Sequence, residues 1–178
     1  MRILSSLAIL LVMLARLSSA EANGDPAEYE AEVKKAEERI PAVNEQYATS
    51  IGCAFHMKKD NIVPYVINGE PSFVGVFSLD NGCTGGSAMS RPVFVVVQHG
   101  GPTISIVVNA EYSAPHQTSS DFPQVITDLF LKDGELWYKA LEFDFAKDAN
   151  CCPSVPVTGR VVYKNREWRG IPDKASPN

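Results

Sequence analysis

The sequence lacks the residues and spacings by which catalytic and metal sites are usually recognised. Only three of its 178 residues are His and four are Cys. No C-x-x-C, H-x-x-x-H or H-E-x-x-H spacing occurs, which argues against a zinc centre and against a thioredoxin-type redox site. There is also no G-x-x-x-x-G-K-[ST] loop and no G-x-S-x-G elbow. We therefore expect a protein that is not an enzyme and that carries no metal or other cofactor.

Long apolar runs are absent after the first part of the chain. Met1-Arg2 is followed by the apolar stretch Ile3–Leu17 and then by small residues that end in Ala20-Glu21-Ala22, an A-x-A arrangement. This succession is typical of a secretory signal peptide, and the run is shorter than the ~20 residues of a membrane span. We predict a cleavable signal peptide at 1–22, a periplasmic or secreted location, and no stable membrane insertion after cleavage.

Positive charge is in slight deficit. The chain has 16 Lys and Arg against 21 Asp and Glu, which gives a formal net charge of −5. An acidic surface disfavours nucleic acid and anionic lipid as partners, because both are negatively charged. We expect a protein or a cell-envelope component as the partner instead.

The four cysteines are an even number, which in an exported chain predicts disulfide bonds. They are Cys53, Cys83, Cys151 and Cys152. Two of the three conceivable pairings cross-link the adjacent Cys151-Cys152 to Cys53 and Cys83. The third joins Cys53 to Cys83 and closes a ring between the neighbours. Adjacent residues meet disulfide geometry only with backbone strain, so we favour a cross-linked pairing.

Beyond residue 22 the sequence predicts helix first and then mainly strands. Asp25-Pro26 is a typical helix start, and apolar residues follow at helical spacing as far as Ile40, where Pro41 kinks or restarts the helix. Beyond Cys53, β-branched and aromatic runs alternate with turn residues, and Asp133-Gly134 gives a strong hairpin signal. The predicted strands are Cys53–Lys58, Ile62–Ile67, Phe73–Leu79, Pro92–Gln98, Ile104–Ala110, Val125–Leu131, Leu136–Phe143 and Val157–Tyr163.

These patterns predict an α+β fold, because strands and helices do not alternate as βαβ units. We expect an amino-terminal helix packed on a mainly antiparallel, disulfide-linked β-sheet with meander connections. The predicted organisation is a single domain at 23–169 and a flexible polar tail at 170–178.

Two polar loops are the predicted binding surfaces, Asp80–Ser87 and Ser113–Asp121. An inhibitor or immunity-type protein could insert such an acidic, exposed loop into the active site of an envelope partner. The candidate binding residues in the two loops are Asp80, Thr84, Ser87, His116, Gln117 and Asp121.

Two alternative functions stay open at this stage. Cys151-Cys152 together with a nearby His would suit a thiol–disulfide redox protein. His56, Met57 and His99 would suit a periplasmic copper- or zinc-binding protein, since imidazole and thioether are copper ligands.

One segment resembles a known group of proteins. Asp148-Ala149-Asn150-Cys151-Cys152-Pro153-Ser154, followed by a strand ending in Val161-Val162-Tyr163, is similar to the D-x-x-C-C-P-[ST] element of a diffuse group of small exported bacterial proteins. Gly85-Gly86, Val93–Gln98 and Val125–Gly134 look like counterparts of the loop, long strand and -DG- turn that precede this element in the group. The members are mostly of unknown function, so the resemblance implies a bacterial, periplasmic setting and assigns no catalytic residue.

Overall fold

The computed structural model describes residues 26–80, 82–83, 90–100, 104–149 and 152–173. The predicted signal peptide at 1–22 lies outside them. The chain divides into two compact units, Met1–Val33 and Lys34–Asn178. Only helical residues are described in the first unit, and the sheets and sites below all belong to the second. No helix in the described ranges is long and apolar enough to cross a membrane.

In the described part of the chain, two helices precede the strands, α2 (Pro26–Glu37) and α3 (Ile40–Ile51). Pro41 lies in the first turn of α3, where its missing N–H removes no helical hydrogen bond, so it restarts the helix. After α3 the chain turns at Gly52, whose N–H donates to the Ala48 carbonyl over 3.2 Å. A Cβ at position 52 would lie 2.5 Å from a methyl carbon of the buried Leu79, so any other residue there would force the Leu79 side chain to shift.

The first sheet is antiparallel throughout, with β3 at its centre. β1 and β2 both pair with β3, whose other partner β4 in turn pairs with β5. The turn between β2 and β3 has positive φ at Asn68 and Gly69, 52° and 86°, as a tight hairpin turn requires. The strands are β1 (Ala54–His56), β2 (Ile62–Ile67), β3 (Glu70–Asp80), β4 (Arg91–His99) and β5 (Ile106–Val108).

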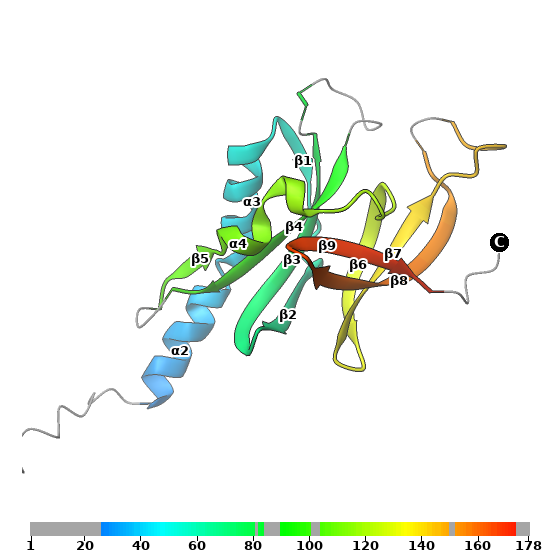
Figure 1. Ribbon diagram of the computed structural model, residues 1–178. Helices are drawn as coiled ribbons and strands as arrows, with labels where there is room; N and C mark the ends of the chain where they lie inside the picture. The colour runs from blue at the N-terminus through cyan, green and yellow to red at the C-terminus, as the bar shows by residue number, and fades with distance from the viewer. Residues whose placement is uncertain (1–25, 81, 84–89, 101–103, 150–151, 174–178) are drawn as a thin grey trace, which may run out of the picture. The chain divides into compact units, whose positions relative to one another are not determined.

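The second sheet is a four-stranded antiparallel meander in sequence order. The predicted hairpin at Asp133-Gly134 is confirmed, with φ of 55° and 77° at these two residues. Between the sheets the chain passes through α4 (Ala110–Ser113) and a short 3-10 helix at Pro115–Gln117 (Figure 1). The strands are β6 (Val125–Lys132), β7 (Glu135–Glu142), β8 (Val155–Lys164) and β9 (Glu167–Pro172).

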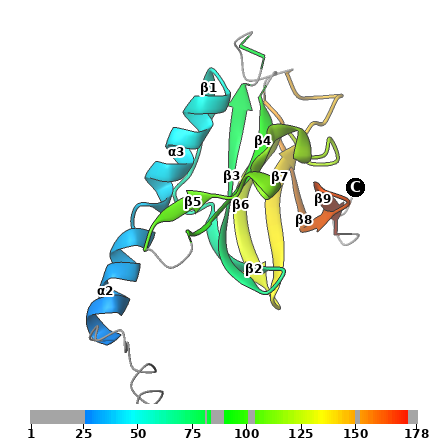
Figure 2. The same ribbon diagram turned by 60° about the vertical axis from the view of Figure 1, so that its left-hand side comes forward.

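β3 and β4 are buried on both faces, which is why Phe94–Val97 reads as a continuous apolar run. One face of these strands, with Phe94, clusters with residues of the second sheet such as Tyr138 and Trp168. The alternate residues, with Phe77, form a second cluster that includes Ile40 and Ala48 of α3. Figure 2 shows α3 running alongside the first sheet. The two-residue alternation of strands thus divides the core into two layers.

The α+β class, the mainly antiparallel pairing and the presence of a disulfide are confirmed. The strands form two sheets, however, where the sequence predicted one. The tail predicted at 170–178 is wrong for Gly170–Pro172, which belong to β9 and pair with β8. The sequence did not predict β9 because it is a polar edge strand in which only alternate residues, such as Trp168 and Gly170, are buried.

The favoured disulfide pairing is also wrong. Cys53 is bonded to Cys83, with Cα atoms 5.2 Å apart, which excludes both cross-linked pairings. This pairing follows from the strand register. Ala54 pairs with Asp80, so Cys53 and Cys83 meet at the same end of β1 and β3. Cys152 is disulfide-bonded as well, whereas Cys151 lies outside the described residues.

Candidate functional site

A loop between β7 and β8 presents Phe145, whose side chain is 93% exposed. No other large apolar side chain in the described ranges is exposed to this extent. Its ring stacks on that of Phe143, with centroids 5.9 Å apart and planes inclined by 24°. We call residues 143–149 the Phe145 loop; Figure 1 shows it at one end of the second sheet.

The Asp148 carboxylate fixes the base of this loop. One of its oxygens accepts hydrogen bonds from the backbone N–H groups of Asp144 and Ser154, both over 2.9 Å. The other accepts from the Ser154 hydroxyl over 2.7 Å. The Ser154 hydroxyl, and next the N–H of Asp144, lower the pKa of Asp148, because hydrogen bonds to a carboxylate favour its charged form.

The turn around Phe145 is closed by Asp144. Its carboxylate accepts from the N–H of Ala146 over 3.0 Å and lies 3.0 Å from the Lys147 ammonium. Its carbonyl accepts from the N–H groups of Lys147 and Asp148, over 2.9 and 2.8 Å. The loop backbone is therefore held by its own hydrogen bonds, and the exposed phenyl ring is presented from a fixed position.

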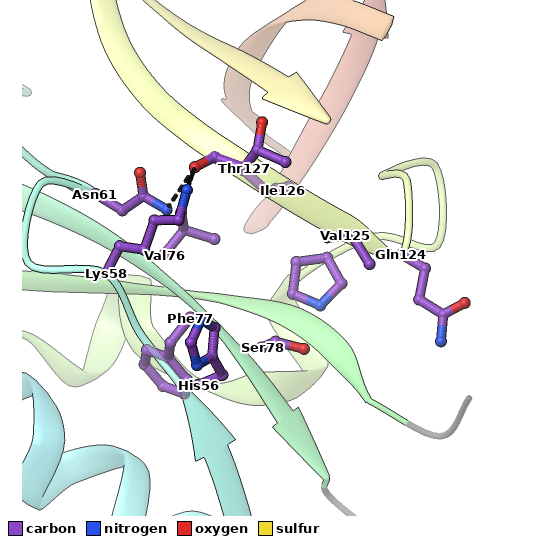
Figure 3. Close-up of a pocket in the computed structure, with 11 residues that line it drawn as sticks. His56, Lys58, Asn61, Val76, Phe77, Ser78, Gln124, Val125, Ile126 and Thr127 are labelled. Carbon is purple, nitrogen blue, oxygen red and sulfur yellow. Dashed lines mark hydrogen bonds between the residues drawn. The ribbon is translucent and has the colours of Figure 1, made fainter. Parts of the chain in front are cut away.

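A second feature is a pocket of about 100 Å³ between the two sheets, which we call the inter-sheet pocket. It lies at the end of the first sheet where β1 pairs with β3, and the start of β6 closes it from the second sheet. Figure 3 shows Gln124–Thr127 on one side and His56, Phe77 and Ser78 on the other. Its polar lining residues are His56, Lys58, Asn61, Ser78, Gln124 and Thr127.

Lys58 and Asn61 join the first sheet to β6 beside this pocket. The Lys58 ammonium and the Asn61 amide both donate to the Thr127 carbonyl, over 3.1 and 3.5 Å (Figure 3). The Asn61 side-chain oxygen accepts from the N–H of Leu129 over 3.1 Å. Asn61 thus supplies to the edge of β6 the two hydrogen bonds that a neighbouring strand would supply.

The Ser113–Asp121 loop was expected to be exposed, but most of it packs along the edge of the hydrophobic core. Ser113 and Thr118 use their hydroxyls to accept from the N–H groups of Val96 and Phe94, over 3.0 and 3.3 Å. The N–H of Ser119 donates to the Trp168 carbonyl over 2.9 Å. The expectation of exposure was wrong because these polar groups satisfy backbone groups of both sheets.

The candidate binding residues do not form one surface. Asp80 and Gln117 are buried, and the Gln117 amide oxygen accepts from the N–H of Ala114 over 3.3 Å. His116 and Asp121 are exposed, with the Asp121 carboxylate 3.9 Å from Arg169. Two further candidates, Thr84 and Ser87, lie outside the described residues.

The residues of the suggested copper or zinc site are not brought together. His56 lines the inter-sheet pocket, whereas Met57 packs against the cluster on the opposite face of the sheet. His99, 3.4 Å from Glu37, lies at the far end of β4. His56 pairs with Ser78 and Ser78 with Pro92, so the two histidines are separated by about 20 Å of strand. No group of three or more His, Cys, Asp and Glu in the described ranges is placed to hold a metal.

The chain matches no protein-family model, no curated protein and no solved structure. Sequence reasoning missed the Phe145 loop, and the signal that could have found it is an aromatic residue between two aspartates, outside the alternation of the neighbouring strands.

Proposed function

We propose that the protein is a periplasmic or secreted binding protein, not an enzyme, which attaches to a protein partner through the Phe145 loop. Its mode of action would be that of an inhibitor or an immunity protein. The observation that carries the proposal is the combination of a 93% exposed phenyl ring with a hydrogen-bonded loop backbone.

The energetics favour an anchor role for Phe145. Burying a phenylalanine side chain stabilises a complex by roughly 1.5–3 kcal/mol relative to leaving it in water. Aromatic side chains that fill a partner's pocket dominate many interfaces. The loop is already ordered by Asp144 and Asp148, so little conformational entropy is lost on binding. The partner should offer an apolar pocket that admits one aromatic ring.

The charges of the Phe145 loop indicate which kind of partner it would bind. The Phe145 loop carries Asp144 and Asp148 against Lys147, and the whole chain has a net charge of −5. A partner with basic groups around its apolar pocket would be attracted to this loop and oriented on it. The disulfide supports a location outside the cytoplasm, since such bonds persist in oxidising compartments.

Quantitative capture from envelope extract tests this proposal. Wild-type protein, Phe145→Ala and the control Leu131→Ala, which truncates a side chain 43% exposed on β6, would be compared by mass spectrometry. We expect one stoichiometric protein retained by the wild type and by Leu131→Ala. Phe145→Ala should weaken its binding by ~30-fold or more, as truncation of an anchor residue does.

Thermal unfolding of the three proteins serves as the control, because Phe145 is almost fully exposed and its truncation should leave the folded state unchanged. If Phe145→Ala retained the partner as well as the wild type does, Phe145 would not be the anchor residue. Absence of any stoichiometric partner at several salt concentrations would contradict the binding function itself.

A further inference from the structure

We propose that the inter-sheet pocket binds a small organic carboxylate, such as a short-chain fatty acid, and that this site is independent of the Phe145 loop. The pocket holds about 100 Å³. A water molecule takes up about 30 Å³ in the liquid, so the space suits about three waters or one ligand of a few non-hydrogen atoms.

The charge of the lining selects an anion. Two side chains that can carry positive charge, His56 and Lys58, line the pocket, and no Asp or Glu is among its described lining residues. The Lys58 ammonium uses one of its three N–H groups on the Thr127 carbonyl, which leaves two for a ligand. An organic cation would meet this ammonium without a countercharge.

Hydrogen-bond donors are paired on one wall. His56 and Ser78 are directly opposite each other on β1 and β3, which places their Cβ atoms about 5 Å apart on the same face. The described residues provide no hydrogen-bond partner for the His56 ring or the Ser78 hydroxyl. A carboxylate has two oxygens with about four acceptor positions and can accept from several of these donors together.

The lining also includes apolar side chains, and these set the form of the ligand. Val76, Pro92 and Ile126 contribute carbon surface on the walls between the polar groups. Figure 3 shows these walls formed by strands of both sheets. A short alkyl chain would be removed from water against this surface while its carboxylate stays with Lys58, His56 and Ser78.

Nuclear magnetic resonance titration of the isotope-labelled full-length protein with sodium butyrate tests the proposal. Butylammonium and 1-butanol serve as cationic and neutral analogues, at constant ionic strength to exclude general salt effects. We expect saturable shifts of the His56, Ser78 and Ile126 amides with butyrate and none with butylammonium. The range should extend to about 20 mM, because ligands of this size bind in the millimolar range.

Matched variants then locate the site. Lys58→Met should weaken butyrate binding by about tenfold or more, since it removes a charge-assisted hydrogen bond. Lys164→Met makes the same change at an exposed position outside the pocket and should bind like the wild type. Ser78→Ala removes only one hydroxyl group and is expected to fold. It therefore tests the site even if Lys58→Met fails to fold.

The proposal is overturned by three results: no saturable shift with butyrate, equal shifts with 1-butanol, or undiminished binding by both Lys58→Met and Ser78→Ala. Phe145→Ala should bind butyrate as the wild type does, so failure of the protein-binding function leaves this test intact.

Discussion

Asp148 and Ser154 are joined twice, because the Asp148 carboxylate accepts hydrogen bonds from both the backbone N–H and the hydroxyl of Ser154. The pair connects the Phe145 loop to the start of β8. The first and last residues of the D-x-x-C-C-P-S segment therefore have a structural role: they fix the loop that carries the exposed phenyl ring.

Low pH should break the hydrogen bonds by which Asp148 holds the Phe145 loop. The pKa of Asp148 is lowered in the folded state, so its interactions stabilise the fold above the unfolded pKa of about 3.9 and are lost as the pH falls through the lower folded value. We expect the Ser154 amide resonance to be constant between pH 5 and 7 and to move toward its unfolded position only below about pH 4.

Asp148→Asn provides the control for this pH effect, since it removes the charge at all pH values. It should show an altered Ser154 amide resonance already at pH 7. A transition centred near pH 6 in the wild type would assign the change to another group, and an unaltered resonance in Asp148→Asn would show that the carboxylate charge is not required.

Asn61→Ala should destabilise the protein by about 1–3 kcal/mol, because it leaves the buried N–H of Leu129 without an acceptor. Urea unfolding followed by tryptophan fluorescence measures the change in the free energy of unfolding. A loss below about 0.5 kcal/mol, as for an ordinary surface substitution, would mean that water replaces the Asn61 side chain at this edge.

Much of the fold could be predicted from local pattern. β2 was predicted with both of its ends, and the hairpin at Asp133-Gly134 was recognised because an Asp-Gly pair readily adopts the positive φ angles of a tight turn. Ile104–Ala110, by contrast, was predicted as one strand, but β5 spans only Ile106–Val108 and Ala110 begins α4. There the Asn109 side chain caps the helix by accepting from the N–H of Glu111.

What could not be predicted depends on contacts between distant residues. The division into two sheets rests on side chains such as Asn61, whose partners Thr127 and Leu129 lie more than sixty residues away. The disulfide pairing follows from strand register, which cysteine spacing does not contain. The exposure of Phe145 depends on the hydrogen bonds of Asp144 and Asp148, which the sequence does not specify, although a phenylalanine between two aspartates could have indicated a loop.

Asn44→Leu should raise the melting temperature. The Asn44 side chain on α3 is 0% exposed, and neither its amide nitrogen nor its oxygen has a hydrogen-bond partner among the described residues. Replacing a buried, unpartnered amide by an apolar group of similar shape removes a desolvation cost of about 1–3 kcal/mol. Calorimetry measures the shift, and a lower melting temperature would indicate that a buried water molecule satisfies Asn44.

Loss of the Cys53–Cys83 bond should destabilise the protein by about 3–4 kcal/mol, because the bond closes a loop with a sequence separation of 30 and restricts the unfolded chain. The double variant Cys53→Ser/Cys83→Ser, unfolded in urea, measures this loss. A change below about 1 kcal/mol would show that the bond restricts the unfolded chain less than its loop length implies.

The edges of the second sheet bear on how the protein behaves at high concentration. An exposed edge strand is a template for fibril growth and for aggregation between copies. Asn61 occupies backbone groups of β6 at one edge, and Thr118 and Ser119 do the same for Trp168 on β9 at the other. Substitution of Asn61 would leave the Leu129 N–H without its acceptor while Lys58 would still occupy the Thr127 carbonyl, so the protection of this edge against pairing between copies would be weakened.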